Sequence, residues 1–385
     1  MARHLLVTND YLPKTGGIQV YLHELWRRLE PGRASVLTAT SHPDAARFDV
    51  ASEVVIERVK APTLILPIPR TLAVIEAAIE RHQPDLVLLD PAWPLGLLGP
   101  RLSRPYGVVL HGAEVTIPGR LPLLASSLRY VLRHAQVVLC AGAYPEAEAR
   151  RNAAEWMPPT IRVAPGVDTD RFVPLEATRR EEVRTSLGLA PSAFLVSSYS
   201  RLVPRKGMDT LIRASALLSD DFPDLQVAIG GAGRDRERLE RMAKKLSAPV
   251  VVLGRVHDDV LPDWLGASDL MVMDCRSRWW GLEQEGFGIV FLEAGACGVA
   301  QIAGRSGGSH EAVRHGVTGL VLENPRSDSE LAASIRRLIE DSEFRAQLSH
   351  NARTFAVEQY DWRVLARRLA SGLAPFDHGD AHWAH

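Results

Sequence analysis

The segment from Glu285 to Ala294 combines residue types that could hold a nucleotide sugar. It reads Glu-Gly-Phe-Gly-Ile-Val-Phe-Leu-Glu-Ala, so a Gly-x-Gly turn runs into an apolar helix start. Backbone N–H groups at a helix start have no partner within the helix and favour an anion such as phosphate. Glu285 precedes the turn and Glu293 lies inside the helix, and carboxylate oxygens accept hydrogen bonds from sugar hydroxyls. The segment therefore predicts a site for a phosphate flanked by two polyols.

Two other loops could contribute to the same site. Gly16 and Gly17 lie between a predicted strand and a helix, where glycine lets the backbone approach a ligand closely. Arg201 and Lys206 follow a strand in the second half of the chain, and both cations suit phosphate oxygens. A plain strand-to-helix loop is the alternative for the glycine pair. A solvated loop is the alternative for the two cations.

His111 also lies at the carboxyl end of a predicted strand, where a side chain faces a ligand site rather than the core. A structural role is an equal alternative for a single histidine. The run from Gly230 to Gly233 lacks the third glycine of a dinucleotide-binding loop, which argues against a hydride-transfer cofactor. We expect these glycines to end a strand beneath the nucleotide.

Composition narrows the class of protein. A chain of 385 residues suggests two or three domains, and 45 Lys and Arg against 46 Asp and Glu give no electrostatic case for nucleic acid. The cysteines Cys140, Cys275 and Cys297 form no C-x-x-C pair, and we expect buried thiols in a reducing cytosol. No apolar run approaches the ~18 residues that span a bilayer, so any membrane contact would be peripheral.

Apolar runs alternate with helical patterns, which predicts an α/β protein with two doubly wound parallel sheets in tandem. In the first half we expect strands at 5–8, 35–39, 86–89, 107–110 and 137–141, and helices at 18–29, 71–81 and 121–134. In the second half we expect strands at 193–199, 225–229, 250–253, 270–273 and 300–303, and helices at 176–187, 209–218, 235–246, 288–297, 330–339 and 344–359. Ligands bind beyond the carboxyl ends of such strands.

Two further segments have open interpretations. Leucines recur at helical spacing from Pro118 to His134, which by default is a core face, but Arg120, Arg129 and Arg133 could instead meet an anionic bilayer. Trp279 and Trp280 stand in a polar loop before Glu285. They could pack between domains or meet an amphiphilic acceptor, and the two alternatives are equal.

These residues together resemble the retaining family-four glycosyltransferases of the GT-B fold, with two Rossmann-like domains facing across a cleft. The match rests on Gly16-Gly17, His111-Gly112-Ala113-Glu114, Pro165-Gly166-Val167-Asp168, Arg201 with Lys206, and the Glu285 and Glu293 pair. It implies domains at 1–168 and 169–359, with a helix at 360–373 that joins the first domain and a disordered tail at 374–385.

The resemblance also implies roles for individual residues. Donor binding falls to Gly16, Gly17, Arg201, Lys206, Val256, Glu285, Phe287, Gly288, Ile289 and Glu293. Acceptor binding falls to Asp10 and Gln19, and catalysis to His111, Arg201, Lys206 and Glu285. Glu285 would hold the sugar hydroxyls and Glu293 the ribose. No cofactor and no tightly bound metal are implied, and Asp168-Thr169-Asp170 is more simply a turn.

A narrower resemblance is to actinobacterial mannosyltransferases that use GDP-mannose and act on phosphatidylinositol mannosides. It rests on residues 8–19, on Cys275-Arg276-Ser277-Arg278 and on 285–294. It implies retaining transfer of mannose to a glycolipid by a cytoplasmic protein, peripheral at the inner face of the plasma membrane. Alternatives are another hexosyltransferase with a different donor or acceptor, a nucleotide-sugar epimerase, and a non-catalytic sensor. The oligomeric state stays open. Gln301 and the Trp279-Trp280 pair depart from the family's pattern.

Overall fold

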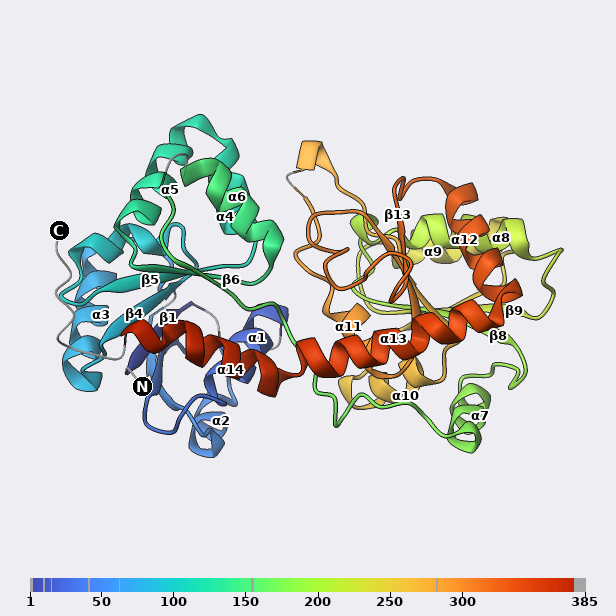
Figure 1. The fold of residues 1–385 in the computed structure, drawn as a ribbon, viewed down its shortest axis with the longest axis horizontal. Helices are drawn as coiled ribbons and strands as arrows, with labels where there is room; N and C mark the ends of the chain where they lie inside the picture. The colour runs from blue at the N-terminus through green and yellow to red at the C-terminus, as the bar shows by residue number, and fades with distance from the viewer. Residues whose placement is uncertain are drawn as a thin grey trace. The chain divides into compact units, whose positions relative to one another are not determined.

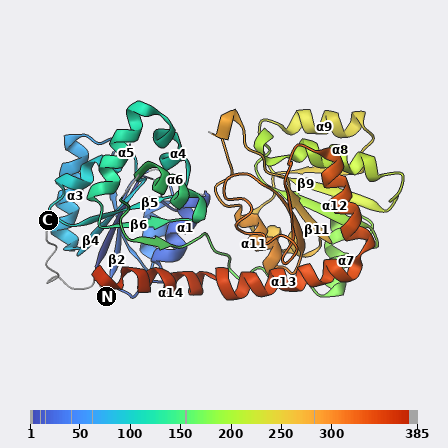
Figure 2. The same cartoon turned by 45° about the horizontal axis from the view of Figure 1, so that its top comes forward.

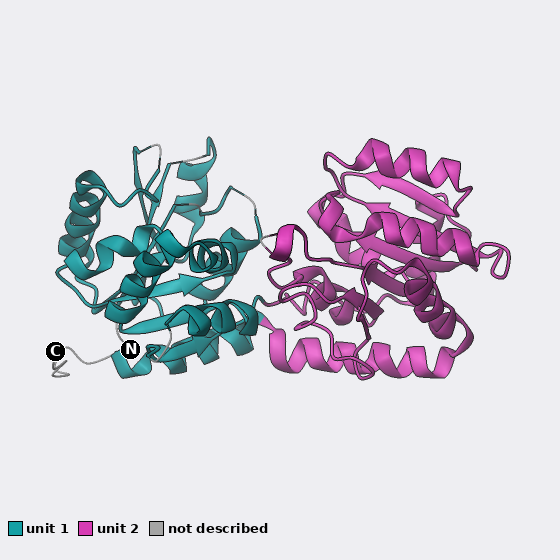
Figure 3. Cartoon of the chain, turned by 90° about the horizontal axis from the view of Figure 1, so that it is seen from above, with its two compact units in different colours: residues 1–165, 362–385 teal, residues 166–361 magenta. Residues whose placement is uncertain are grey.

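The computed structural model describes residues 3–9, 11–14, 16–40, 42–61, 63–153, 156–281 and 283–376. The chain forms two compact units, shown in two colours in Figure 3. Unit 1 contains residues 1–165 and the segment from Trp362 onward, and unit 2 contains Gly166–Asp361. Each unit is a parallel sheet with helices on its faces, so the predicted α/β class with two doubly wound sheets is confirmed.

The described residues of unit 1 form a seven-stranded sheet in the order β3-β2-β1-β4-β5-β6-β7 (Figure 1). Its strands are β1 (His4–Thr8), β2 (Ala34–Ala39), β3 (Val55–Val59), β4 (Leu86–Asp90), β5 (Tyr106–Leu110), β6 (Val137–Cys140) and β7 (Thr160–Arg162). Its helices are α1 (Gly17–Trp26), α2 (Ala45–Ala51), α3 (Pro69–His82), α4 (Ala113–Arg120), α5 (Pro122–His134), α6 (Ala143–Ala153) and α14 (Trp362–Leu373), with 3-10 segments η1 (Leu95–Arg101) and η5 (Ala374–Phe376).

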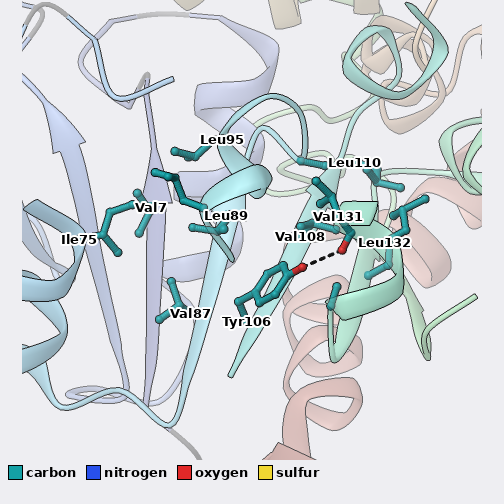
Figure 4. Packing of buried hydrophobic residues seen from close by; sticks show 14 of the residues in the cluster. Val7, Ile75, Val87, Leu89, Leu95, Tyr106, Val108, Leu110, Val131 and Leu132 are labelled. Carbon is teal, nitrogen blue, oxygen red and sulfur yellow. Dashed lines mark hydrogen bonds between the residues drawn. The ribbon is translucent and has the colours of Figure 1, made fainter. Parts of the chain in front are cut away.

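Alternate residues of the unit 1 strands pack on opposite faces of the sheet. Val7 and Leu89 face α3 and α5, where the Tyr106 hydroxyl donates a hydrogen bond to the carbonyl of Val131 at 2.7 Å (Figure 4). Leu6 faces the other way, toward α1 and the C-terminal helix α14 (Figure 2). Because both faces are covered, the central strands β1, β4, β5 and β6 are almost continuously apolar, whereas the edge strand β3 is partly exposed and carries Glu57 and Arg58.

The described residues of unit 2 form a six-stranded sheet in the order β10-β9-β8-β11-β12-β13. Its strands are β8 (Phe194–Tyr199), β9 (Leu225–Gly230), β10 (Val250–Gly254), β11 (Leu270–Met273), β12 (Ala300–Gly304) and β13 (Leu320–Leu322). Its helices are α7 (Ala177–Ser186), α8 (Met208–Leu218), α9 (Arg236–Lys245), α10 (Leu261–Gly266), α11 (Ile289–Ala296), α12 (Asp328–Glu340) and α13 (Ser342–Tyr360), with 3-10 segments η2 (Pro204–Lys206), η3 (Asp258–Val260) and η4 (Trp279–Gly281).

Each sheet has one point where the strand order reverses, between β1 and β4 in unit 1 and between β8 and β11 in unit 2. Loops that leave neighbouring strands there diverge to opposite faces of the sheet, which opens a crevice for a ligand. The predicted site residues Gly16, Gly17, Arg201 and Lys206 follow β1 and β8, so the topology places them at these two points.

Several expected elements differ from the structure. The sequence patterns do not predict β3, β7 and β13, because β3 is partly exposed and the other two strands are three residues long. The expected helix from Leu121 begins at Pro122. Residues 374–376 form η5, and Phe376 packs into the core of unit 1 rather than extending into a disordered tail. The rest of the expected tail, 377–385, lies outside the described residues.

The three cysteines are free thiols and are buried, as expected. Burial raises the pKa of each thiol, to about 12 for Cys297, so none is a reactive thiolate at neutral pH. Among the described helices, none is both long and apolar enough to cross a membrane.

Gln301 on β12 is an unfavourable group in the core of unit 2. Its side chain is 1% exposed, its Nε2 lies 3.5 Å from the carbonyl of Val299, and its Oε1 has no hydrogen-bond partner among the described residues. Replacing Gln301 with Leu should raise the free energy of unfolding by about 1 kcal/mol or more, because the unsatisfied buried oxygen is removed at similar volume. Urea unfolding checks this; a lower midpoint for the Leu variant would contradict it.

Candidate functional site

Glu285 in unit 2 is surrounded by cations. Its Oε2 lies 2.8 Å from Nζ of Lys206 and 3.5 Å from Nε of Arg205, and all three side chains are largely buried. Burial by itself would raise the pKa of Glu285, but the charges of Lys206 and Arg205 hold it below its ordinary value. Glu285 is therefore ionised at neutral pH. The sequence did not predict Arg205 as a site residue. It is next to Lys206 in the chain, and the sequence pattern gives no sign that both side chains reach the same carboxylate.

Arg276 anchors the loop that carries these cations. The Arg276 guanidinium makes two 2.8 Å hydrogen bonds to the carboxylate of Asp209 at the start of α8. Its backbone N–H donates to the carbonyl of Arg205 at 2.9 Å. The ends of β8 and β11 are thus tied together, which fixes the position of the Lys206 ammonium group.

The turn before α11 brings backbone rather than side chains into the site. Gly288 has φ of +87°, a left-handed conformation that favours glycine, and Ile289 begins the helix. Phe287 is buried and packs on the ring of Tyr360 at 5.8 Å between centroids. Gly308 donates its N–H to the carbonyl of Glu285 at 2.9 Å.

The Gly307-Gly308 turn after β12 is a part of the site that the sequence predictions missed. A Cβ added to Gly308 would lie 2.0 Å from the carbonyl oxygen of Gly286, so only glycine permits this backbone approach. The signal was present in the sequence as a Gly-Gly pair beyond a strand. The pair resembles Gly16 and Gly17, which also follow a strand.

Glu293 has a different environment from Glu285. It lies on α11, partly buried, and its carboxyl group forms no hydrogen bond with another described residue. Burial raises its pKa to about 7, and the carboxylate of Asp258 acts in the same direction against the opposing charge of Arg171. A half-protonated carboxyl group without a protein partner is suited to accept hydrogen bonds from a ligand.

Arg201 and Val256 lie at the ends of neighbouring strands. Arg201 follows β8 and is exposed, and its guanidinium has no ion-pair partner among the described residues. Val256 follows β10 and touches the end of β9, since a Cβ on Gly230 would lie 2.5 Å from Cγ2 of Val256. Gly231 packs on the Arg201 loop, because its added Cβ would lie 1.8 Å from the carbonyl oxygen of Ser200. These glycines end β9, as expected.

In unit 1, Thr8, Asp90 and His111 form a chain of hydrogen bonds across the ends of β1, β4 and β5. Nε2 of His111 lies 2.8 Å from Oδ1 of Asp90, and the Thr8 hydroxyl donates to Oδ2 of Asp90 at 2.6 Å. Burial favours neutral imidazole, but the charge and hydrogen bond of Asp90 outweigh it and raise the pKa of His111. The sequence predictions missed Asp90, whose signal is a single carboxylate ending a leucine-rich strand.

The other predicted residues of unit 1 lie at the same edge of the sheet. Gly16 and Gly17 stand at the start of α1, directly after the β1 loop. Gln19 is partly buried, and its side chain lies over Gly16, where an added Cβ would be 2.3 Å from Gln19 Oε1. Asp10 is outside the described residues. The carboxyl edge of unit 1 therefore holds His111, both glycines and Gln19.

Comparison with known proteins identifies the class. The family model "Glycosyltransferase Family 4" matches residues 15–171, and "Glycosyl transferases group 1" matches 179–355. Among solved structures, Anabaena HepE in complex with UDP superposes with a TM-score of 0.81 at 23% identity, covering 97% of this chain and 100% of that one. Sucrose-phosphate synthase from Thermosynechococcus elongatus superposes with a TM-score of 0.76 at 19% identity, covering 97% and 98%. The fold is GT-B.

Curated relatives extend over nearly the whole chain. A GDP-mannose-dependent alpha-(1-6)-phosphatidylinositol monomannoside mannosyltransferase of Mycolicibacterium smegmatis is 37% identical over 96% of this chain and 98% of its own. The Mycobacterium tuberculosis protein of the same description is 38% identical over 97% and 98%. A Corynebacterium glutamicum enzyme described for the monoacylated acceptor is 34% identical over 96% and 97%. This chain belongs to the family-four glycosyltransferases.

The first site prediction concerns Asp90. Replacing it with Asn should lower the pKa of His111 relative to the parent, because burial is then opposed only by the charge of Glu114. In the parent the pair stabilises the fold fully below the unfolded pKa, and this is lost as pH rises through the raised folded pKa. NMR titration of the His111 ring checks this. A His111 pKa as high in the Asn variant as in the parent would show that Asp90 is not the cause.

The second site prediction separates the two carboxylates. Glu293→Gln should raise the unfolding temperature of the ligand-free protein at pH 8, and this gain should shrink as pH falls toward 5. The parent must bury a charge above its folded pKa of about 7, whereas Gln is neutral throughout. The same variant should bind GDP roughly tenfold or more weakly, because a charged hydrogen bond is lost.

Glu285→Gln serves as the matched variant. It should leave GDP affinity within about twofold of the parent and nearly abolish transfer, since Glu285 is assigned to the sugar. We expect calorimetry with GDP to separate the two variants. Equal losses of GDP affinity would show that the division of roles is wrong.

Proposed function

We propose that this glycosyltransferase transfers mannose from GDP-mannose to a phosphatidylinositol mannoside, with retention at the anomeric carbon. The similarity to three enzymes with such descriptions over at least 96% of the chain carries the proposal. The arrangement of unit 2 supports it, because an ionised Glu285 for sugar hydroxyls stands beside the Lys206 ammonium for phosphate.

Departure of the diphosphate creates negative charge, which fixed cations stabilise. The Lys206 ammonium is paired with Glu285. A bound diphosphate would share that ammonium, and Glu285 could then accept hydrogen bonds from the sugar. Arg201 is exposed and would supply a second cation without breaking a protein ion pair. The start of α11, after Gly288, adds backbone donors.

Most of the remaining predicted donor-binding residues would contact the nucleotide sugar through backbone or apolar groups. Gly16 and Gly17 would let the start of α1 approach the diphosphate, and Phe287 and Gly288 would present backbone to the sugar. Val256 and Ile289 would also contact the donor. Glu293 would hold the ribose. These roles follow from the family resemblance, and the positions described above are compatible with them.

His111 would lie near the transferred sugar. Since Asp90 holds Nε2, the ring orientation is fixed and Nδ1 is the nitrogen left for a ligand. We assign no enzymic nucleophile: the acceptor hydroxyl attacks from the face that the diphosphate leaves, and a donor phosphate oxygen takes its proton. Asp10 and Gln19 would contact the acceptor. The proposal needs no cofactor and no tightly bound metal.

A lipid acceptor requires contact with a membrane surface, which we assign to the corner between α4 and α5. Ile117, Leu121 and Leu123 are 41%, 43% and 93% exposed there, and Arg133 is exposed on α5. Bilayer contact through such a corner would make the enzyme peripheral at an anionic membrane.

The structure changes which arginines can take part in this contact. Arg120 pairs with Glu148 at 3.0 Å, and Nε of Arg129 donates to the carbonyl of Asn152 at 3.1 Å. Both therefore hold unit 1 together, and the expected three-arginine patch reduces to Arg133. Of the predicted leucine stripe, Leu128 and Leu132 are buried core residues.

Product analysis tests the proposed function. Purified protein, radiolabelled GDP-mannose and vesicles containing phosphatidylinositol mannoside should yield a lipid with one more α-linked mannose, and EDTA should not stop the reaction. UDP-glucose should be a poor donor. Transfer only to free sugars would assign another acceptor, conversion of the donor without acceptor would indicate an epimerase, and binding without turnover would indicate a sensor. A metal requirement restored by a divalent ion would overturn the metal-free mechanism.

A further inference from the structure

The turn formed by residues 278–281 and 283, here called the tryptophan turn, presents two large apolar side chains to solvent. Trp279 is 57% exposed and Trp280 is 96% exposed, whereas Trp26 and Trp362 are buried in the core of unit 1. Full exposure of an indole is unfavourable in water, and soluble proteins seldom place two such side chains together. The proposed function has not used these residues.

Hydrogen bonds between Arg278 and Glu283 close the base of the turn. The backbone N–H of Arg278 donates to the carbonyl of Glu283 at 2.9 Å, and that of Glu283 donates back at 3.2 Å. The side chains repeat the link, with Nη1 of Arg278 donating to Oε2 of Glu283 at 2.9 Å. The Arg278 guanidinium also lies over the ring of Trp279, 4.7 Å from its centroid. The indoles are therefore held on a hydrogen-bonded base.

The backbone at the tip of the turn is strained at both tryptophans. Trp279 and Trp280 have φ of +48° and +53°, a left-handed conformation that bulky residues rarely adopt. Glycine or asparagine would adopt it at lower cost. Strain of this kind persists where a side chain is needed for a function, so the pair of tryptophans calls for a ligand or surface.

We propose that the tryptophan turn inserts Trp279 and Trp280 into the headgroup region of the lipid surface that carries the acceptor. Indole is apolar with one N–H donor and gathers at the boundary between acyl chains and water. The charges beside the turn fit an anionic surface. Arg278 in the turn is paired with Glu283, and Arg205 is largely buried between Glu283 and Glu285. The exposed Arg326, whose guanidinium donates to the carbonyl of the flanking residue Ser277, leaves a positive charge beside the turn.

The tryptophan turn is connected to the proposed donor site, so a membrane contact at the turn would position that site. Arg205 lies 3.6 Å from Glu283 and 3.5 Å from Glu285, so one guanidinium joins the base of the turn to the carboxylate assigned to the donor sugar. Glu285 lies five positions after Trp280 along the chain, which limits the distance between their Cα atoms to about 17 Å. Docking through the turn would hold the donor sugar within reach of a headgroup that projects from the membrane. This inference rests on the proposed lipid acceptor.

The test uses the double variant Trp279→Asn with Trp280→Asn, because asparagine tolerates the left-handed backbone and is polar. Vesicles with phosphatidylinositol and the mannoside acceptor are the binding probe. The variant should bind them at least roughly tenfold more weakly, since burying half of one indole corresponds to more than that factor. GDP affinity should be unchanged. The matched control is Leu217→Asn, an exposed leucine on α8 at 60% exposure, which should bind vesicles like the parent.

Turnover separates a membrane contact from a headgroup contact. On the deacylated, water-soluble acceptor the double variant should match the parent, while on vesicle-borne acceptor its kcat/KM should fall in parallel with vesicle binding. Equal loss on both acceptors would overturn the proposal in favour of a direct contact with the acceptor sugars. Unchanged vesicle binding would overturn it outright. Absence of transfer by the parent itself would refute the proposed function, while the vesicle-binding comparison would still stand as a measurement.

Discussion

The arrangement of unit 2 depends on the ion pair between Lys206 and Glu285. Removing two charges from water is costly, and a buried pair persists only where geometry and further partners compensate. Arg205 supplies a second cation at 3.5 Å from the same carboxylate, and Arg276 with Asp209 anchors the loop that carries both. The result is a local excess of positive charge that is fixed before any ligand arrives. A site for a diphosphate needs this property, because cations that need not reorganise stabilise a developing anion most effectively.

Both units concentrate their polar groups at the carboxyl ends of strands near the point where the strand order reverses. Unit 1 has Thr8, Asp90 and His111 there, and unit 2 has the Lys206 and Glu285 pair. Buried polar side chains inside the strands are fewer and are often unsatisfied: the hydroxyls of Thr38 on β2 and Ser198 on β8 have no hydrogen-bond partner among the described residues. Gln301 is the largest of these groups, buried within β12 with an unsatisfied oxygen.

Much of this organisation could be predicted from the sequence. Apolar runs bounded by glycine and proline marked most strands, and the Glu285 to Glu293 segment marked the turn before α11. The predictions failed where the relevant contact is distant along the chain. Asp90 lies 21 residues from His111, and Gly308 lies far enough from Glu285 that no periodic pattern links them. The prediction of a bilayer contact for Arg120 and Arg129 was wrong for the same reason. Arg120 binds Glu148 and Arg129 binds Asn152, and both partners lie on a later helix.

The two carboxylates of the donor segment show why spacing alone cannot assign roles. Glu285 and Glu293 are eight positions apart and chemically identical, yet their pKa values are displaced in opposite directions. Lys206 and Arg205 stabilise the charge on Glu285, whereas burial and the charge of Asp258 outweigh the opposing charge of Arg171 and raise the pKa of Glu293 to about 7. An ionised Glu285 carboxylate can hold the Lys206 ammonium in place. The raised pKa of Glu293 lowers the cost of its burial, because the neutral form needs less solvation, and this is compatible with the proposed role of Glu293 at the ribose.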